Sequence, residues 1–367
     1  MRVTTHILIL ITSFFYCMAF GLTAETSSDE AGERVGSITS GLAEISGICA
    51  SRRNPGVFWA HNDSGSNGCI YAFDASGAKK ATCQLQCNWR NPRTSLTELW
   101  TLGASCDLED IAAATINGVH YLLVGNVGGN TPSHSADLLL FEEPDLKNVN
   151  DAQLMNLVAS SYTHFLWPTG SLCRIENHSR CRRERLLRNN CEAVALTDEG
   201  EIFLITKSGP ADMFRLKLNI APTKNRGASF PVDPDLTRTS LCPLTSVGSR
   251  SFGVNPTGMD IYKSPNGQRT MAVLSSSFNC GQIRQYTIPS CAEFDRGTYA
   301  PIRTWSETIS GQLYSRLKMP QMEGICYGYD PATGSSTNLY VTSERANTLL
   351  LVARLPLPSA MTPAPTP

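Results

Sequence analysis

The sequence has little net charge and lacks any long stretch of helical periodicity. Its 31 lysines and arginines and 32 aspartates and glutamates give a formal net charge of −1. This balance gives no electrostatic reason to expect nucleic acid or an anionic membrane as a partner. The lack of helical periodicity argues against a fold built mainly from helices.

Several signatures of catalytic and metal sites are also absent. The chain contains no Gly-x-Ser-x-Gly, His-Glu-x-x-His or P-loop motif, which removes the usual sequence evidence for three large enzyme classes. No Cys-x-x-Cys pair occurs, so a thiolate metal site is not expected either. Any site chemistry must therefore come from residues that are far apart in the sequence.

A short segment, in which a polar residue opens a run of small and apolar residues, recurs five times. The openings lie 65, 83, 65 and 66 residues apart, at Glu44, Glu109, Glu192, Thr257 and Glu323. Repeats of this length indicate a radial or solenoid architecture. The pattern also places a polar side chain, usually a carboxylate, at an equivalent position in every repeat.

Each opening is followed by further runs of β-branched and aromatic residues, which are typical of strands. Turn sequences such as Asp74–Gly77 and Asp198–Gly200 join these runs as hairpins. We therefore predict an all-β fold, a five-bladed β-propeller of four-stranded antiparallel blades. Val35–Thr39 would close the ring as the outer strand of the last blade. Six blades, with one hidden in residues 145–190 or 215–250, remain an alternative, and a β-sandwich is the competing fold.

The N-terminus has the features of a secretory signal, with the apolar run Ile7–Gly21 followed by small residues up to Ala24. Cleavage after Gly21 is an alternative to cleavage after Ala24. We expect three segments: a signal peptide at 1–24, a single propeller domain at 25–355, and a Pro-rich disordered tail at 356–367. The protein is thus expected to be secreted and monomeric, without a membrane span.

The cysteines and glycosylation sequons agree with export. Loss of Cys17 with the signal leaves 12 of the 13 cysteines, and an even number in a secreted chain favours disulfides. Connectivity cannot be derived from the sequence, although two pairs are near enough to close loops: Cys173 with Cys181, and Cys280 with Cys291. The sequons at Asn62 and Asn177 predict glycosylation.

The repeated polar openings predict a metal site. The first strand of each propeller blade lines the central channel, so the five openings would converge at one mouth. Ionised carboxylates in a narrow channel repel one another unless a cation compensates, and oxygen ligands favour Ca²⁺. The predicted calcium ligands are Glu44, Glu109, Glu192, Thr257 and Glu323. Alternatively, these side chains cap neighbouring strands by accepting backbone N–H hydrogen bonds.

This ring resembles that of the five-bladed, secreted calcium-activated nucleotidases (apyrases), in which the blades contribute Glu and hydroxyl residues to a central Ca²⁺. The resemblance implies that Thr257 is the hydroxyl ligand, and the closing blade, which ends in Ser343-Glu344, also looks similar. The segment from Glu44 to Gly65, together with Glu109–Ala112, looks like uncharacterised bacterial secreted propellers. Six-bladed lactonases and phosphotriesterases are a third relative of the pattern, with Asn62 and Asn126 as loose matches to their ligands.

Residues at the ends of the second strands should reach the same mouth. His61 and Asp63 are the candidate catalytic residues, with His61 as general base toward a metal-polarised water; the alternative is that Asp63-Ser-Gly is an Asx-type turn between strands. A glycan on Asn62 would crowd the mouth, which counts against catalysis. The candidate substrate-binding residues are Lys207, Arg345 and Asn126. The two cations could hold a phosphate or carboxylate, or could neutralise surplus carboxylates.

Two classes of function fit these observations. One is a calcium-dependent hydrolase that acts on a small anionic substrate, either phosphate-containing or an ester. The other is a non-catalytic extracellular binding or matrix protein, in which a structural calcium in the channel fixes the blades. The fold alone does not decide between them, because propellers host both.

Overall fold

A computed structural model of the chain describes the residues that build its sheets. The described residues are 33–38, 41–63, 65, 67–90, 96–128, 135–150, 153–166, 190–207, 211–222, 227–230, 245–250, 255–264, 267, 269–277, 280–288, 303–308, 321–331, 338–343 and 348–354. All of them lie in the second of two compact units, Met1–Glu30 and Ala31–Pro367. The predicted signal peptide and Pro-rich tail lie outside the described residues. Within these ranges, no helix has the length and apolarity needed to cross a bilayer.

The described residues form strands, turns and loops and no helix, which confirms the all-β prediction for this part of the chain. The strands assemble into five main sheets, which we number I to V. Sheet I contains β2 (Ile45–Ala50), β3 (Val57–Asn62), β4 (Cys69–Asp74), β5 (Lys79–Arg90), β6 (Thr97–Thr101) and β10 (Leu154–Val158). Sheet II contains β7 (Leu108–Ile116), β8 (Val119–Asn126), β9 (Ser135–Glu142) and β11 (Ser161–Leu166).

The remaining sheets follow the same plan. Sheet III contains β12 (Cys191–Leu196), β13 (Glu201–Thr206), β14 (Ala211–Lys217) and β17 (Thr245–Arg250). Sheet IV contains β18 (Pro256–Lys263), β19 (Arg269–Ser277), β20 (Cys280–Ile288) and β21 (Arg303–Thr308). Sheet V contains β22 (Met322–Tyr327), β23 (Asn338–Ser343), β24 (Thr348–Arg354) and β1 (Glu33–Ser37). A separate two-stranded sheet joins β15 (Asn219–Ile220) to β16 (Ala228–Ser229).

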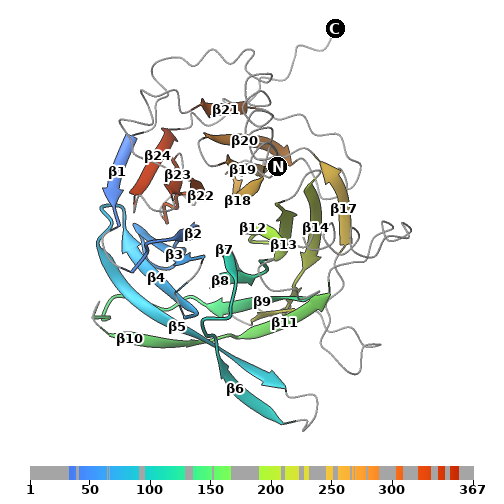
Figure 1. Cartoon of the computed structure of the whole chain (residues 1–367). Coiled ribbons are helices and arrows are strands. Elements are labelled where there is room, and N and C mark those ends of the chain that lie inside the picture. Colours follow the sequence, from blue (N-terminus) through green and yellow to red (C-terminus); the bar gives the residue numbers. More distant parts are fainter. Residues whose placement is uncertain are drawn as a thin grey trace, which may run out of the picture. The chain divides into compact units, whose positions relative to one another are not determined.

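The five main sheets lie around a common centre (Figure 1). Their first strands contact one another in the order β2, β7, β12, β18 and β22, and β22 contacts β2 in turn. Five clusters of buried apolar side chains fill the spaces between successive sheets, the last of them between sheets V and I. The burial of apolar side chains in these five clusters, rather than in one continuous core, therefore stabilises the fold.

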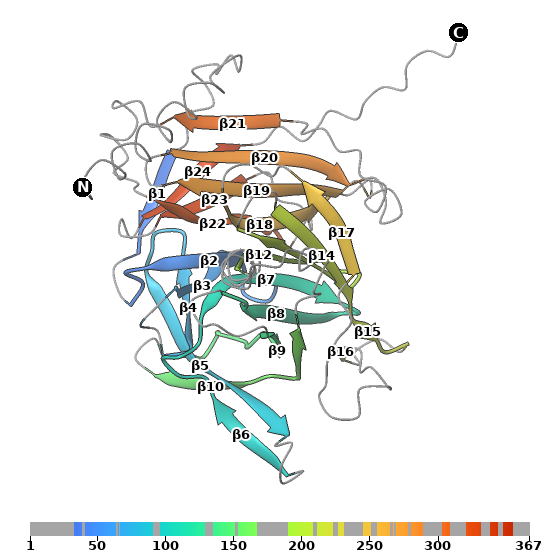
Figure 2. The same ribbon diagram turned by 45° about the vertical axis from the view of Figure 1, so that its right-hand side comes forward.

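Sheet I departs from the predicted antiparallel pattern. Strand β10 pairs in parallel with β5, Leu154 lying opposite Thr82. The chain reaches β10 from sheet II, so no hairpin imposes antiparallel pairing on it. Met155 and Leu157 pack against the core between sheets I and II. Figure 2 shows β6 and the end of β5 extending away from the rest of sheet I.

A β-bulge lies near the start of every first strand. The pairing register shifts at Ser46–Gly47 in β2, Glu109 in β7, Glu192 in β12, Thr257 in β18 and Glu323–Gly324 in β22. An extra residue on one strand bends the strand locally and redirects its side chain. The bulges therefore place a polar side chain from each sheet at the same end of the first strands.

The seven cysteines whose side chains are described are free thiols, and all but Cys106 are buried: Cys49, Cys69, Cys83, Cys87, Cys106, Cys191 and Cys326. Most of them belong to the apolar clusters between sheets, where a thiol packs as a small hydrophobic group. The expected disulfides are therefore not found among these residues. The candidate pairs Cys173/Cys181 and Cys280/Cys291 involve side chains outside the described part of the chain.

Candidate functional site

The bulges correct the alignment of the first repeat. Ser46, not Glu44, occupies the bulge of β2 and corresponds to Glu323 in β22. Glu44 lies two residues earlier, where its backbone N–H donates to Asn62 Oδ1 at 3.2 Å. The repeated element is thus a polar residue two positions before an apolar one, as in Ser46-Gly-Ile and Glu323-Gly-Ile.

The two hydroxyl residues of the set tie adjacent sheets together. Ser46 Oγ donates a hydrogen bond of 2.8 Å to the carbonyl of Glu109 in sheet II. Thr257 Oγ1 donates one of 3.2 Å to the carbonyl of Met322 in sheet V. Thr257 is 1% exposed, and it does not line the cavity described below. The structure therefore gives Thr257 an inter-sheet contact and does not bring it to the carboxylates as a ligand.

The three bulge glutamates meet in one cavity of about 150 Å³. Its described lining residues are Ile45, Ser46, Asp63, Glu109, Asn190, Glu192, Lys207, Gln321 and Glu323. Five residues expected from the sequence are among them, namely Asp63, Glu109, Glu192, Lys207 and Glu323. Glu44, His61, Asn126 and Thr257 are not. We call this space the acidic cavity.

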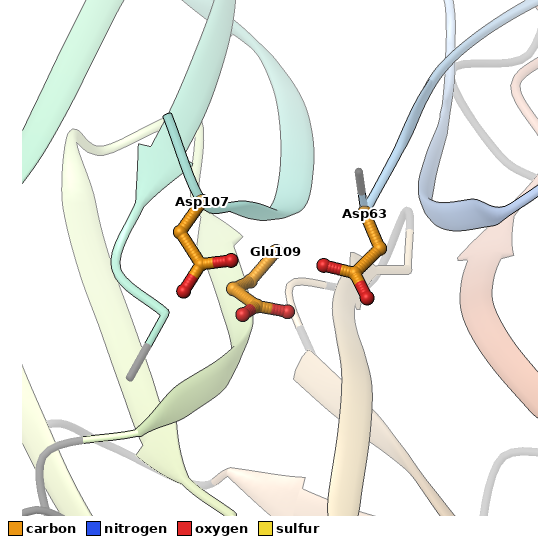
Figure 3. Close-up of side chains that lie close together, drawn as sticks. All are labelled: Asp63, Asp107 and Glu109. Atoms are coloured by element: carbon orange, nitrogen blue, oxygen red, sulfur yellow. The ribbon is translucent and has the colours of Figure 1, made fainter. Parts of the chain in front are cut away.

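Two acidic residues of the cavity lining, Asp63 and Glu109, form a close group with Asp107, which is not among the described lining residues. Asp63, Asp107 and Glu109 each offer a carboxylate oxygen, and these three atoms lie within 4.8 Å of one another. Figure 3 shows Glu109 between the two aspartates, with Asp63 at the end of β3 and the other two at the start of β7. We call these residues the acidic triad. Asp107 is new relative to the sequence prediction.

Asn126 fixes the position of Asp107 rather than lining the cavity. Its Oδ1 accepts a hydrogen bond of 2.7 Å from the backbone N–H of Asp107. Its Nδ2 donates one of 2.8 Å to Asp137 Oδ2. The amide of Asn126 is thus occupied at both ends, and its geometry supports a positioning role for the acidic triad.

Gly128, which has no side chain, leaves the space that two carboxylates of the acidic triad occupy. A Cβ on Gly128 would lie 2.1 Å from both Asp107 Oδ2 and Glu109 Oε1, far inside van der Waals contact. Gly128 also donates its backbone N–H to the carbonyl of Asp107 at 3.3 Å. Two carboxylates therefore converge in space that any side chain at position 128 would occupy.

Burial and mutual repulsion disfavour the charged forms of these glutamates. Burial raises the pKa of Glu109 well above its usual value, and Glu192, Asp63 and Asp107 raise it further. Burial also raises the pKa of Glu192, although Lys207 and Asn190 oppose this change. An acidic cavity of this kind favours either bound protons or a bound cation.

The cavity lining also contains an ion pair. Lys207 Nζ pairs with Glu192 Oε1, and Asn190 Nδ2 donates to the same oxygen at 2.9 Å. The other amide atom, Asn190 Oδ1, is buried without a hydrogen-bond partner. A buried acceptor in this state normally has a partner such as a water or an ion.

The donor set fits a hard divalent cation. The acidic triad, Glu323 and Asn190 Oδ1 supply carboxylate and carbonyl oxygens, and Ca²⁺ takes six to eight such ligands. No thiol or imidazole lines the cavity among the described residues, which disfavours a transition metal. The orphaned Asn190 oxygen and the glycine-lined triad are the two observations that support this fit.

His61 is enclosed by the protein. It is 0% exposed, and burial lowers its pKa to about 4. Its Nδ1 lies 3.1 Å from the carbonyl of Asn62, and Nε2 is buried without a hydrogen-bond partner. Since His61 does not line the acidic cavity, the structure offers no direct path from its ring to a bound water.

The side-chain amide of Asn62 is also hydrogen-bonded within the fold. Its Nδ2 donates a hydrogen bond of 2.8 Å to the carbonyl of Gly41, and its Oδ1 accepts the N–H of Glu44. A glycan on Nδ2 would break the first contact and would need space at a residue that is 7% exposed. This geometry argues against glycosylation of the folded protein at Asn62. Arg345 and Asn177 lie outside the described residues.

Comparison with known proteins identifies no family. No family model and no curated protein matches the sequence. Similar solved structures include the α-L-arabinofuranosidase PaAbf62A of Podospora anserina in complex with cellotriose (11% identity, 89% of this chain and 98% of that chain covered, TM-score 0.44). Others are the major allergen Mala s 1 of Malassezia sympodialis (10%, 89% and 96%, 0.39) and the Dos1 propeller (9%, 88% and 74%, 0.29). These comparisons do not show the expected resemblance to calcium-activated nucleotidases, and likenesses this weak carry no argument about activity.

Proposed function

We propose that the chain is a secreted, calcium-binding, five-bladed β-propeller that hydrolyses small phosphate-containing or ester substrates at the acidic cavity. The observation that carries the proposal is the convergence of Asp63, Asp107 and Glu109, two of which, Asp63 and Glu109, line that cavity. Calcium would be held by this triad, with Glu323 and Asn190 Oδ1 within the same lining. The apolar run Ile7–Gly21 supports export.

The pairing of the chain ends supports five closed blades. Strand β1 pairs antiparallel with β24, and the fifth apolar cluster joins sheets V and I. In the segments considered for a sixth blade, β10, β11 and β17 each join an existing sheet, and β15 and β16 form only a two-stranded sheet. A truncated chain that lacks residues 1–37 should unfold at a lower temperature than one that starts at residue 25, because it exposes the edge of β24. Equal melting temperatures would contradict closure by β1.

Calcium binding is tested by titration of the intact protein. Ca²⁺ that binds the folded state alone raises the melting temperature by mass action. We expect Asp107→Asn and Glu109→Gln to lose most of this shift. Glu44→Gln is the matched control, because Glu44 lies outside the acidic cavity, and it should keep the shift. A full shift in both triad variants would overturn the proposed site.

Hydrolysis would use a bound metal ion together with the charged side chains of the cavity lining. A metal ion there would polarise a bound water or a substrate oxygen. Glu192 and Glu323 lie in the same lining and can accept a proton from an attacking water. Lys207 supplies positive charge toward an anionic substrate group, once its ion pair with Glu192 opens. The expected activity on nucleoside diphosphates, phosphoesters or lactones requires Ca²⁺ and is lost in Glu109→Gln.

A specific observation favours the second candidate, a non-catalytic extracellular binding or matrix protein. His61, which lies two residues before the lining residue Asp63, is buried. Lys207 is already paired with Glu192. In that case Ca²⁺ would only fix the blades and an outer surface would bind the partner. Calcium-dependent stabilisation without turnover across the substrate panel would select this function over the hydrolase.

A further inference from the structure

Lys207 lies in the cavity where carboxylates from sheets I, II, III and V meet. It follows β13 directly, and its backbone N–H donates to the carbonyl of Asn190 at 2.7 Å. The side chain is 34% exposed, whereas its partner Glu192 is 6% exposed. Among the described residues that line the acidic cavity, Lys207 is the only cation, against four acidic side chains.

The pKa of the Lys207 ammonium depends on other carboxylates besides that of Glu192, its ion-pair partner. Burial lowers its pKa, but Glu192, Glu323 and Glu109 together outweigh burial and raise the pKa above its usual value. These three glutamates come from the bulges of sheets III, V and II. The charge of Lys207 is therefore attracted to the same carboxylates that were expected to surround a central metal ion.

The contacts distinguish two groups of side chains at the cavity. In the first, Glu192 Oε1 accepts from both Lys207 Nζ and Asn190 Nδ2. In the second, the oxygens of the acidic triad converge beside Gly128. A divalent cation close to Glu192 would meet like charge from Lys207, and this repulsion is strong in a partly buried site.

We propose that Lys207 is a tethered counter-cation that stays beside Glu192, so that the acidic cavity binds a single divalent cation, at the acidic triad. The proposal rests on the proposed calcium function and adds the residue that sets the affinity and the number of ions. Lys207 is a positioning residue here, since it acts through the electrostatic field and through Glu192.

The test is calorimetric titration of Ca²⁺ into the folded protein at constant ionic strength. Wild type is expected to bind one ion. Lys207→Met keeps the length of the aliphatic chain and removes the charge, so Ca²⁺ should bind about tenfold more tightly or a second ion should appear. Unchanged affinity with one ion, or weaker binding, would overturn the proposal.

Lys207→Met leaves the buried Glu192 without its cation and could therefore unfold the protein. A second variant tests the proposal in that case. The double variant Lys207→Met/Glu192→Gln removes both charges of the pair and should bind a single ion, no less tightly than wild type. Loss of its Ca²⁺ binding would contradict the assignment of the ion to the acidic triad. Lys263→Met is the matched control, since Lys263 pairs with Glu199 at 2.5 Å outside the acidic cavity; its titration should match wild type.

The outcomes separate this inference from the proposed function. If wild type binds one ion and Lys207→Met behaves identically, the calcium function stands and the role of Lys207 falls. If wild type binds no Ca²⁺ but Lys207→Met does, the role of Lys207 stands and the calcium function of the natural protein falls. Binding in neither protein would overturn both.

Discussion

The carboxylate of Asp110 in sheet II accepts a hydrogen bond of 2.8 Å from the backbone N–H of Val194 in sheet III. Asp260 in sheet IV makes the same kind of contact with the N–H of Tyr327 in sheet V, also at 2.8 Å. Each carboxylate also accepts the N–H of the residue that follows it. Buried aspartates therefore link neighbouring first strands, which is close to the capping role considered for the glutamates.

The first prediction concerns Asp260. Burial raises its pKa from 3.8 to about 6, against the opposing effects of Arg52 and the two N–H donors. Its stabilising contribution is thus complete below pH 3.8 and is lost as the pH rises through 6. Asp260→Asn should destabilise the protein more at pH 4.5 than at pH 7.5, by about 2 kcal/mol. Urea unfolding at both pH values measures this, with the exposed Asp330→Asn as control; a pH-independent difference would contradict it.

The second prediction concerns Glu143, which follows β9 and is 1% exposed. Its carboxylate accepts hydrogen bonds from five groups in sheet I and the loop after β2: Ser51 Oγ, the backbone N–H groups of Arg52 and Arg53, Asn54 Nδ2 and Trp59 Nε1. Glu143→Ala removes the acceptor of all five groups and leaves the buried Ser51 Oγ and Trp59 Nε1 without it, so it should cost roughly 3 kcal/mol of unfolding free energy. The neighbouring exposed Glu142→Ala should cost less than about 0.5 kcal/mol. Similar losses in both variants would refute this role.

The third prediction concerns Gly128. Its replacement by alanine places a Cβ against Asp107 and Glu109, which should separate the triad oxygens and weaken Ca²⁺ binding by at least about tenfold. Gly103→Ala is the control, because no atom lies within 4 Å of the added Cβ. Thermal shift with and without Ca²⁺ compares the two variants. Equal Ca²⁺ responses would show that the triad does not hold the ion.

The fourth prediction concerns the sequon at Asn62. Because both atoms of its amide are hydrogen-bonded within the fold, peptide mass spectrometry of protein secreted from a eukaryotic host should find position 62 unmodified. Asn62→Gln should instead reduce stability, since the longer side chain cannot keep both contacts. A glycan at high occupancy on Asn62 would contradict the structure around Gly41 and Glu44.

The sequence predicts the repeated strands well because their apolar runs and turns are local signals. In the turn Asp74–Gly77, Asp74 Oδ1 accepts the N–H groups of Ser76 and Ala78, and Gly77 has a positive φ of 89°, as its turn sequence indicates. Strand β6 gave no such signal. Most of its residues are exposed, so its sequence shows no alternation of apolar and polar residues.

The site was only partly predictable, for a different reason. Glu109, Glu192 and Glu323 follow from the repeat, but the correct match of Ser46 depends on a bulge whose register is set by pairing with β3. Asp107 belongs to the site because β3, β7 and the chain at Gly128 meet there. The motif Asp107-Leu-Glu109 was a usable local signal, since alternate residues at the start of a strand point to the same side.

The most direct measurement of the central claim is a crystal structure of the protein grown with Ca²⁺, with the ion located by anomalous scattering. The account predicts one peak bounded by Asp63, Asp107 and Glu109, with oxygen ligands at about 2.3–2.6 Å, and Lys207 still beside Glu192. A peak between Glu192 and Glu323, or no peak at saturating Ca²⁺, would contradict it.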